Sequence, residues 1–310
     1  MSVILAQSPP TRISWGPLSA TMVADSLNPA GVRLSTLEVV LPRFLLAEAN
    51  THRMLSRNAE SSRSKGADRI RKEPLFTPLM RAENKKMRAD EILDTEDKAR
   101  SAWEEAAKSA AAWSETLSAL GVHHSIPNRL LEPFRTVRWL VSFTESANFL
   151  SLRFSPEAEP HFQAVAALII LALRQHSPVQ AKFGDWHAPY LRPDEASALG
   201  ITTAIHVSVA RCARLTVGRE LSVLTRGEVD KELGLYERLL ENRHMSPFEH
   251  VAQAENDTNL VAGDGNFRGW YQWRKTIDEE NLDGAFDPLS VSDQVLETIV
   301  PGWTEEKVQL

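Results

Sequence analysis

Apolar and polar residues alternate along residues 34–41, and this period of two predicts a β-strand. Leu37 and Leu41 share one face with the valine between them, so we expect that face to be buried. Pro42 suits the first turn of a helix, because it has no amide hydrogen to leave unpaired there. The pattern therefore predicts a strand followed by a helix that continues to about Arg53.

Apolar residues recur at helical spacing in several later segments. This spacing predicts helices over residues 94–121, 129–154, 161–176, 203–217 and 231–242. The first of them has an apolar stripe that includes Trp103 and Trp113, and we expect both tryptophans in the core. The segment His244–His250 is predicted to be a turn that leads into a strand near Val251.

Two segments are predicted to lie outside the packed core. Residues 66–90 are charged and are interrupted by prolines, which predicts a mobile surface loop. After about residue 287 few apolar residues remain, so we expect a loosely packed tail. No short-period repeat is visible, and we treat residues 1–310 as a single domain.

The composition excludes several classes of protein. The chain has 310 residues and a net charge of −6, which argues against a general nucleic-acid-binding protein because duplex binding depends on phosphate neutralisation. Its one cysteine, Cys212, excludes a disulfide framework and a cysteine-rich zinc site, and we expect a buried structural thiol and no metal. The longest apolar run, 164–173, is too short to span a bilayer, so we expect a cytoplasmic protein without membrane contact.

The most informative stretch of the chain is Thr51–Ser64, which contains a histidine, three arginines and four serines. It directly follows a segment that is predicted to be buried. Cations and hydroxyl groups at the end of a buried element suit an anion such as a nucleotide phosphate. The alternative is a solvated basic turn with no ligand.

The spacing within this stretch resembles the signature of the flavin-dependent thymidylate synthases. His52 and Arg53 are followed after seven residues by Ser61 and then by Arg63, as in the signature of that family. Three further blocks resemble the same family: Asn128–Phe134, Asn148–Arg153 followed by His161–Gln163, and Ala213–Thr216 together with His244–His250. The blocks together cover most of residues 35–275.

The order of these blocks differs from that of the family. The Ser-Pro-Phe-Glu-His block, which comes first in the family, comes last here at residues 246–250. We interpret this as circular permutation, with a strand and basic helix at 35–53 echoed at about 250–276. The resemblance then implies an α+β fold with an antiparallel or mixed sheet flanked by long helices. It also implies a homotetramer, of a phage type that acts in the host cytoplasm.

The resemblance assigns roles to individual residues. Arg153 and Ser61 would be catalytic, with Arg153 bonded to the pyrimidine carbonyls. Other residues that would bind the deoxynucleotide are Arg63, Arg129, Glu48 and Gln272. Residues that would bind the flavin or border the folate are His52, Arg53, Asn148, His161, His244, Ser246 and Arg274. For Arg129 and Arg153 a surface ion pair is the alternative, and for His161 a helix position without a ligand.

The implied reaction transfers a one-carbon unit from methylenetetrahydrofolate to C5 of a pyrimidine deoxynucleotide monophosphate, with FAD and NADPH as cofactors. The ordinary outcome is conversion of dUMP to dTMP. A first alternative is hydroxymethylation of dCMP or dUMP for modified-base DNA. A second alternative is a non-catalytic nucleotide-binding relative.

Three residues depart from the family pattern. Thr51 replaces an arginine, Glu48 replaces a glutamine, and Ala59 replaces a glutamate although Glu60 is adjacent. These changes surround the nucleotide and the flavin, so they leave open whether the base is uracil or cytosine. We expect the echoed segment 268–275 to supply the missing glutamine and cations.

Overall fold

The computed structural model describes residues 2–4, 12–64, 66–83, 91–215, 225–259, 261, 264–277 and 291–299. The chain divides into two compact units, residues 1–276 and 277–310. The described helix of the second unit is α9 (Asp293–Ile299), and the rest of the predicted tail lies mostly outside the described residues. The strands, the pockets and all predicted site residues belong to the first unit.

Two sheets form the framework of this unit. The larger sheet has the strand order β2-β3-β4-β6-β5, with β7 paired to β3, and the smaller has the order β1-β8-β9-β10. The larger sheet comprises β2 (Arg12–Trp15), β3 (Leu18–Leu27), β4 (Arg33–Pro42), β5 (Ser56–Ala59), β6 (Thr136–Phe143) and β7 (Val179–Gln180). The smaller comprises β1 (Val3–Ile4), β8 (Trp186–His187), β9 (Ala252–Ala254) and β10 (Trp270–Gln272). All pairings are antiparallel except β1–β8 and β3–β7, so the predicted α+β fold with mixed sheets is confirmed.

Helices surround the sheets. The α-helices of this unit are α1 (Leu46–Ala49), α2 (Ala67–Arg71), α3 (Glu96–Ala119), α4 (Ala147–Phe154), α5 (Pro160–Gln175), α6 (Pro193–Leu199), α7 (Ile201–Arg214) and α8 (Arg226–Glu241). Short 3-10 helices are η1 (Arg43–Leu45), η2 (Ser62–Ser64), η3 (Pro127–Phe134), η4 (Ser246–His250) and η5 (Trp273–Thr276). Among the helices described, none has the length and apolar character needed to cross a membrane.

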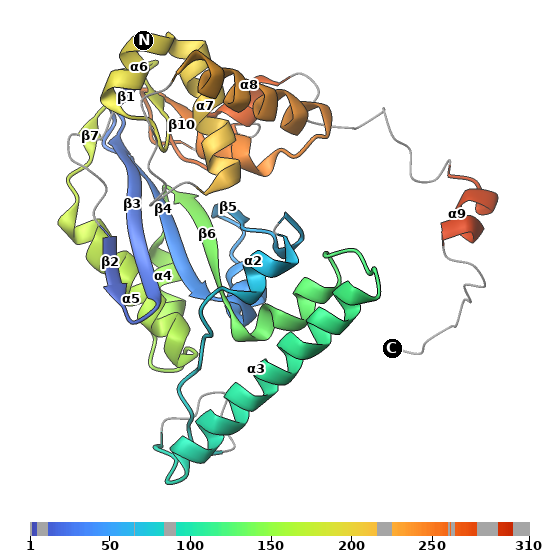
Figure 1. The fold of residues 1–310 in the computed structure, drawn as a ribbon. Helices are drawn as coiled ribbons and strands as arrows, with labels where there is room; N and C mark the ends of the chain where they lie inside the picture. The colour runs from blue at the N-terminus through green and yellow to red at the C-terminus, as the bar shows by residue number, and fades with distance from the viewer. Residues whose placement is uncertain are drawn as a thin grey trace. The chain divides into compact units, whose positions relative to one another are not determined.

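The main core lies between the larger sheet and α5, which runs along β2, β3 and β4 (Figure 1). Leu37 and Leu41 of β4 are fully buried on this side, as the alternation predicted. Trp139 of β6 joins them, and Phe162 and Ile169 of α5 cover them. Burying a large apolar side chain contributes on the order of 1.5–3 kcal/mol, so this layer fixes which face of the sheet points to α5.

The prediction that residues 129–154 are helical in large part holds at the two ends of the segment and is wrong at its centre. This segment forms η3, then β6 at the centre of the sheet, then α4. In β6 the valines and Trp139 alternate with polar residues, and the pairing with β4 and β5 overrides the helical spacing read from the sequence. Strand β3 was not predicted, because its small serine, alanine and threonine residues give a weak pattern. The helix predicted to reach Arg53 ends at Ala49, and α2 occupies part of the loop predicted at 66–90.

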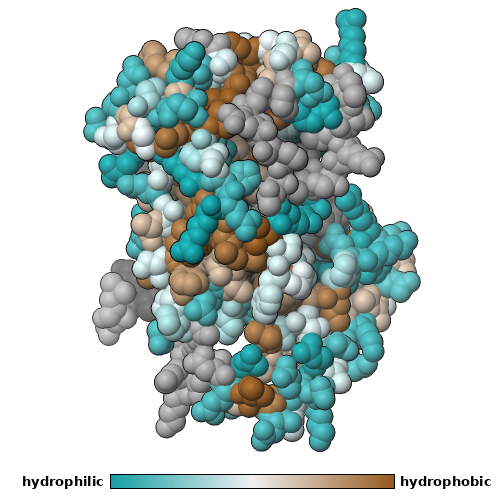
Figure 2. Space-filling model, turned by 90° about the vertical axis from the view of Figure 1, so that its left-hand side faces the viewer, coloured by the Kyte–Doolittle hydropathy of each residue, from teal (hydrophilic) through white to brown (hydrophobic). Residues whose placement is uncertain are grey.

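Helix α3 is buried much less than its apolar stripe predicted. Ala107 and Ser114 are its buried residues within the described chain. Trp103 is half-buried and donates to the carbonyl of Phe76 at 2.9 Å, but Trp113 is 63% exposed, so its predicted place in the core is wrong. The side of the unit that carries β2, β7 and α5 also presents apolar side chains among hydrophilic ones (Figure 2). Both surfaces leave apolar area open to a partner.

The opposite face of the larger sheet carries a buried chain of polar side chains. It joins β8 and η4 to the sheet by five hydrogen bonds of 2.6–2.8 Å that link, in order, Ser26, His187, Thr36, Ser142, His250 and Asn58. The first five of these side chains are at most 2% exposed. Buried polar groups are costly unless they are paired, and here each neighbour supplies the partner.

The donor and acceptor of each hydrogen bond in this series of side chains can be assigned by starting from Asn58 at its end. The amide nitrogen of Asn58 donates to the carbonyl of Cys212 at 3.1 Å, so its oxygen accepts from His250 Nε2. His250 Nδ1 then accepts from Ser142, whose hydroxyl accepts from Thr36. Thr36 in turn accepts from the histidine on β8, and that ring accepts from Ser26. Burial keeps both imidazoles neutral, and with neutral rings these directions hold for every bond of the series.

Burial lowers the pKa of both His187 and His250 to about 3, from the ordinary 6.5. Acidification from about pH 7 to about pH 5 should therefore destabilise the fold, because the unfolded histidines take up protons that the buried ones cannot. Each contributes a slope of about 1.4 kcal/mol per pH unit below the unfolded pKa of about 6.5, so between the two pH values the free energy of unfolding should fall by roughly 4 kcal/mol in total. Urea unfolding at the two pH values measures this. The exposed variant His123→Gln should keep the slope, and equal stability at both pH values would contradict the prediction.

Candidate functional site

A pocket of about 570 Å³ lies where the chain leaves α1 and where α4 begins. We call it the His52 pocket, and its walls include Thr51, His52, Arg53, Asn148, Phe149 and Arg153. Its size is within the range of small-molecule sites. Two motif blocks that are almost one hundred residues apart in the sequence thus meet in one cavity.

Arg57 holds the loop that presents this histidine. Its guanidinium donates to the carbonyls of Asn50, His52 and Leu55 at 2.6, 3.1 and 2.9 Å. The carbonyl of His52 also accepts from the amide of Leu55 at 3.3 Å, and Arg57 adds side-chain donors to this loop after the end of α1. Arg57 therefore holds the loop in place, and its donors are used there rather than on a ligand.

Arg153 is the centre of the polar wall. Its Nε donates to Nε2 of His52 at 2.9 Å, and its Nη1 donates to Glu48 at 3.0 Å. The guanidinium carbon lies 4.8 Å from the ring centre of Phe162, which gives a cation–π contact. These contacts fix the guanidinium plane, and Nη2 has no bonded partner among the described residues.

His52 presents a neutral ring to the pocket. An arginine nitrogen can only donate, so His52 Nε2 accepts and the ring proton lies on Nδ1. Burial and then the positive charges of Arg153 and Arg57 lower the pKa of His52. Phe149 packs edge-on against the ring at 4.8 Å and holds its orientation. The site therefore combines a fixed cation with a neutral hydrogen-bond donor, a pair that stabilises negative charge on an oxygen atom.

The structure gives each departure from the family pattern a local partner. The hydroxyl of Thr51 donates to the carbonyl of Glu48 at 2.7 Å and closes the end of α1. The carboxylate of Glu48 forms the ion pair with Arg153. Ala59 packs against the main core, whereas Glu60 faces a second pocket on the other side of the sheet, so Glu60 does not replace the missing glutamate.

Ser61, Arg63 and Arg129 form a second group, on the 3-10 helices η2 and η3. The amide of Asn128 donates to the carbonyl of Ser62 at 2.9 Å and joins these two helices. All three predicted residues are exposed, and neither arginine has an ion-pair partner within the described chain. Exposed guanidinium groups beside a serine hydroxyl are suited to a phosphate.

The two groups lie at opposite ends of β5. The His52 pocket includes Leu55, just before the strand, and Ser61 comes two residues after it. Five residues of extended chain span roughly 16 Å. The backbone of Ser61 and that of the pocket residue Leu55 are therefore separated by the length of β5 within one chain.

The Ser-Pro-Phe-Glu-His block forms η4. His244 and Ser246 are exposed at its start, while Phe248 and His250 are fully buried. Arg274, from the echoed segment, donates to the carboxylate of Glu249. The predicted cofactor residues at 244 and 246 thus lie on the surface outside the His52 pocket, and the block's inner side anchors the polar chain.

Gln272 has a structural place rather than the predicted substrate contact. It is 2% exposed, and its amide donates to Ser56 at 2.8 Å and to the carbonyl of Glu249 at 2.9 Å. Both amide hydrogens are used. The echoed segment meets the pocket through Arg268, one of the cations expected from it, which pairs with the pocket residue Glu145.

His161, predicted to border the cofactors, is bonded within the protein at both ring nitrogens. Its Nδ1 lies 2.6 Å from the carboxylate of Glu159, and its Nε2 accepts from the amide of Leu79 at 3.0 Å. The ring is 4% exposed. These contacts correspond to the alternative of a helix position without a ligand.

Comparisons with known proteins give likenesses among solved structures only. No family model matches the chain, and no curated protein matches it. Among solved structures, the chain is similar to a UMP/dUMP methylase, PolB from Streptomyces cacaoi, in a crystal structure bound with 5-Br dUMP. The two are 21% identical, with a TM-score of 0.40 over 46% of this chain and 66% of that one. The matched part therefore spans just under two thirds of the length of that protein.

The geometry of the pocket predicts the behaviour of its histidine. Replacement Arg153→Gln removes the larger of the two charges that lower the pKa of His52, so this pKa should rise. An NMR titration of the imidazole measures it. The control Arg53→Gln removes an exposed cation that does not contribute to the shift, and it should leave the pKa unchanged. An unchanged value in Arg153→Gln would show that the guanidinium does not lie against the ring.

Proposed function

We propose that this chain is a flavin-dependent enzyme that transfers a one-carbon unit from methylenetetrahydrofolate to C5 of a pyrimidine deoxynucleotide monophosphate, in the ordinary case from dUMP to give dTMP. The observation that carries the proposal is the bonded set of Glu48, Arg153 and His52 beside one pocket. These residues come from two of the blocks that resemble the flavin-dependent thymidylate synthases.

The residues of the His52 pocket fit a flavin. Arg53 and Asn148 offer donors at its rim, and the buried ring of Phe149 offers an apolar wall. The neutral ring of His52 can donate from Nδ1 without adding charge. Bound flavin would supply the reducing chemistry, for which Cys212 is no substitute, since burial strongly raises the pKa of that thiol.

Arg153 would stabilise the negative charge that develops on a pyrimidine oxygen when the ring is attacked. Its free Nη2 and its fixed plane support this role, because a donor that is already oriented costs no reorganisation. Arg63 and Arg129 would bind the phosphate, with the hydroxyl of Ser61 beside them.

Glu48 favours a second candidate function. One carboxylate oxygen accepts from Arg153, and the other has no hydrogen-bond partner among the described residues, on a side chain that is 45% exposed. Such an acceptor suits the amino group of cytosine, whereas uracil has a carbonyl there. Hydroxymethylation of dCMP is therefore the alternative that this residue supports.

We also propose that the complete site requires more than one subunit, as in the tetramers of the resembled family. The separation of the two residue groups by β5 supports this, because residues of one chain and of a neighbour can then meet. The exposed apolar side chains of α3 and η3, including Trp113 and Leu130, offer surface for such contacts.

The reaction is tested by weighing its product. Incubation with FAD, NADPH, methylenetetrahydrofolate and either dUMP or dCMP should add a methyl group to dUMP. Arg153→Ala should lower turnover by about 10²–10³-fold, the usual cost of losing a donor to an oxyanion, and should keep bound flavin. Arg174→Ala, on the exposed end of α5, is the matched control. A hydroxymethyl product, or reaction with dCMP alone, would favour the second candidate. A colourless protein that does not bind FAD would contradict the proposed flavoenzyme. It would favour the remaining alternative, a non-catalytic nucleotide-binding protein.

Shared sites are tested by complementation. Arg153→Ala and Arg63→Ala should each be inactive alone, yet co-expressed chains should regain activity, because some sites then combine an intact residue from each chain. Light scattering should find an oligomer in both variants. A monomer with full activity, or no recovery in mixed oligomers of confirmed composition, would contradict shared sites.

A further inference from the structure

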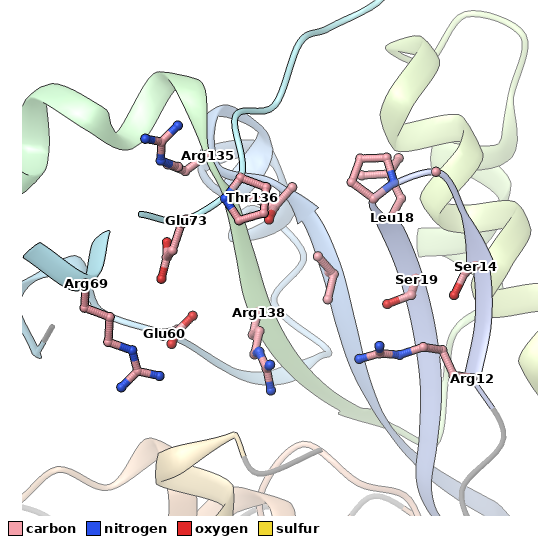
Figure 3. Close-up of a pocket in the computed structure, with 14 residues that line it drawn as sticks. Arg12, Ser14, Leu18, Ser19, Glu60, Arg69, Glu73, Arg135, Thr136 and Arg138 are labelled. Atoms are coloured by element: carbon pink, nitrogen blue, oxygen red, sulfur yellow. The ribbon is translucent and has the colours of Figure 1, made fainter. Parts of the chain in front are cut away.

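A second pocket, of about 510 Å³, lies on the face of the larger sheet that α5 does not cover. Most of the charged side chains that line it are arginines, namely Arg12, Arg69, Arg135 and Arg138 (Figure 3). Glu60 and Glu73 also line it, so the charges of the lining sum to four positive and two negative. We call it the Arg12 pocket.

Strand pairing explains why polar residues meet here. Ser14 pairs with Ser19, Ser19 with Val40, and Val40 with Arg138, which forms one row across four strands. The amide of Glu60 continues the row by donating to the carbonyl of Arg138 at 2.9 Å. Because successive side chains point to opposite faces, this row is the solvent side of strands whose other side forms the core.

Arg138 forms an ion pair with Glu38 at 3.2 Å, whereas Arg12 and Arg69 have no ion pair among the described residues. The guanidinium of Arg12 donates a long hydrogen bond of 3.4 Å to the hydroxyl of Thr21. Arg69 is exposed and has no ion pair within the described chain. The side chain of Arg135 is largely buried and donates to main-chain carbonyls at 3.2–3.4 Å, with no carboxylate bonded to it in the described structure. Burial lowers the pKa of Arg135, and Glu73 opposes that shift.

The cations are spread over a distance that one phosphate does not cover. Arg12 on β2 and Arg138 on β6 are separated by three strand spacings, about 14 Å between backbones, and Figure 3 shows their side chains extending into the same space. Arg69 approaches from the opposite side (Figure 3). Guanidinium groups and hydroxyls bind phosphate oxygens, so this arrangement suits several linked phosphates.

We propose that the Arg12 pocket binds an oligophosphate ligand of the nucleoside di- and triphosphate class, recognised through its phosphates. The lining has no aromatic side chain on which a base would stack, whereas the carboxylates of Glu60 and Glu73 can accept from sugar hydroxyls. The volume admits a nucleotide.

This site is separate from the proposed reaction site. Ser61, Arg63 and Arg129 do not line it, and neither does any residue of the His52 pocket. The inference therefore does not rest on the proposed function. A ligand here would act on the reaction only through the strands that the two sites share.

The test is calorimetric titration of the full chain, without flavin or folate, with tripolyphosphate, ATP, dTTP and orthophosphate. The first three should bind with similar affinity and at least tenfold more tightly than orthophosphate. Arg12→Ala and Arg69→Ala should each weaken tripolyphosphate binding at least tenfold. Both residues are exposed, so both variants should fold, and an unchanged melting temperature without ligand checks this.

Two controls separate this site from others. Arg100→Ala removes an exposed cation of α3 that pairs with Glu96, and it should leave binding unchanged. Arg63→Ala should also leave it unchanged, whereas loss of binding in Arg63→Ala alone would place the ligand in the proposed reaction site and overturn the inference. Unweakened binding in both Arg12→Ala and Arg69→Ala, absence of binding, or equal binding of citrate would overturn it as well.

Discussion

The buried hydrogen-bond chain from Ser26 to Asn58 is the constraint on which the rest of the structure depends. It passes through two neutral imidazoles and crosses from the smaller sheet to the larger. An unpaired polar group at this depth costs about 1–3 kcal/mol, so the loss of one member leaves its neighbours unsatisfied as well. A chain of this kind is stable in one register only, and it therefore sets how η4 and β8 sit on the sheet.

The position of β5 follows from this anchoring. Asn58 is held by His250, and Ser56 is held by Gln272, so both ends of this short strand are bonded to the later part of the chain. A four-residue edge strand has few ladder bonds of its own. The loops on either side, which carry His52 and Arg63, are thereby fixed by residues from a motif more than 180 positions away.

The arginines show how contact decides role. Arg211 is buried and forms a bidentate ion pair with Glu195. Arg57 donates its hydrogen bonds to loop carbonyls, and Arg153 donates one of its hydrogen bonds to a histidine. The guanidinium of Arg12 contacts only a neutral hydroxyl among the described residues, so its charge is not paired there. All four have the same chemistry in the sequence. Their desolvation and their partners differ, and these determine whether a guanidinium stabilises the fold or remains available to an anion.

The sequence by itself determined the strand at 34–41, the helices near 94–121, 161–176, 203–217 and 231–242, and the clustering of His52 with Arg53, because local periodicity and short motifs encode these features. Only the tertiary structure decided that β6 is a central strand, since its two neighbours lie far away in the chain. Only the tertiary structure brought Arg153 against Glu48. Only the tertiary structure, too, engaged Gln272 and His161 in hydrogen bonds within the protein. Trp113 has the same helical spacing as a core residue, yet it is 63% exposed. Burial and pairing depend on which distant elements arrive at a face, and no local pattern carries that information.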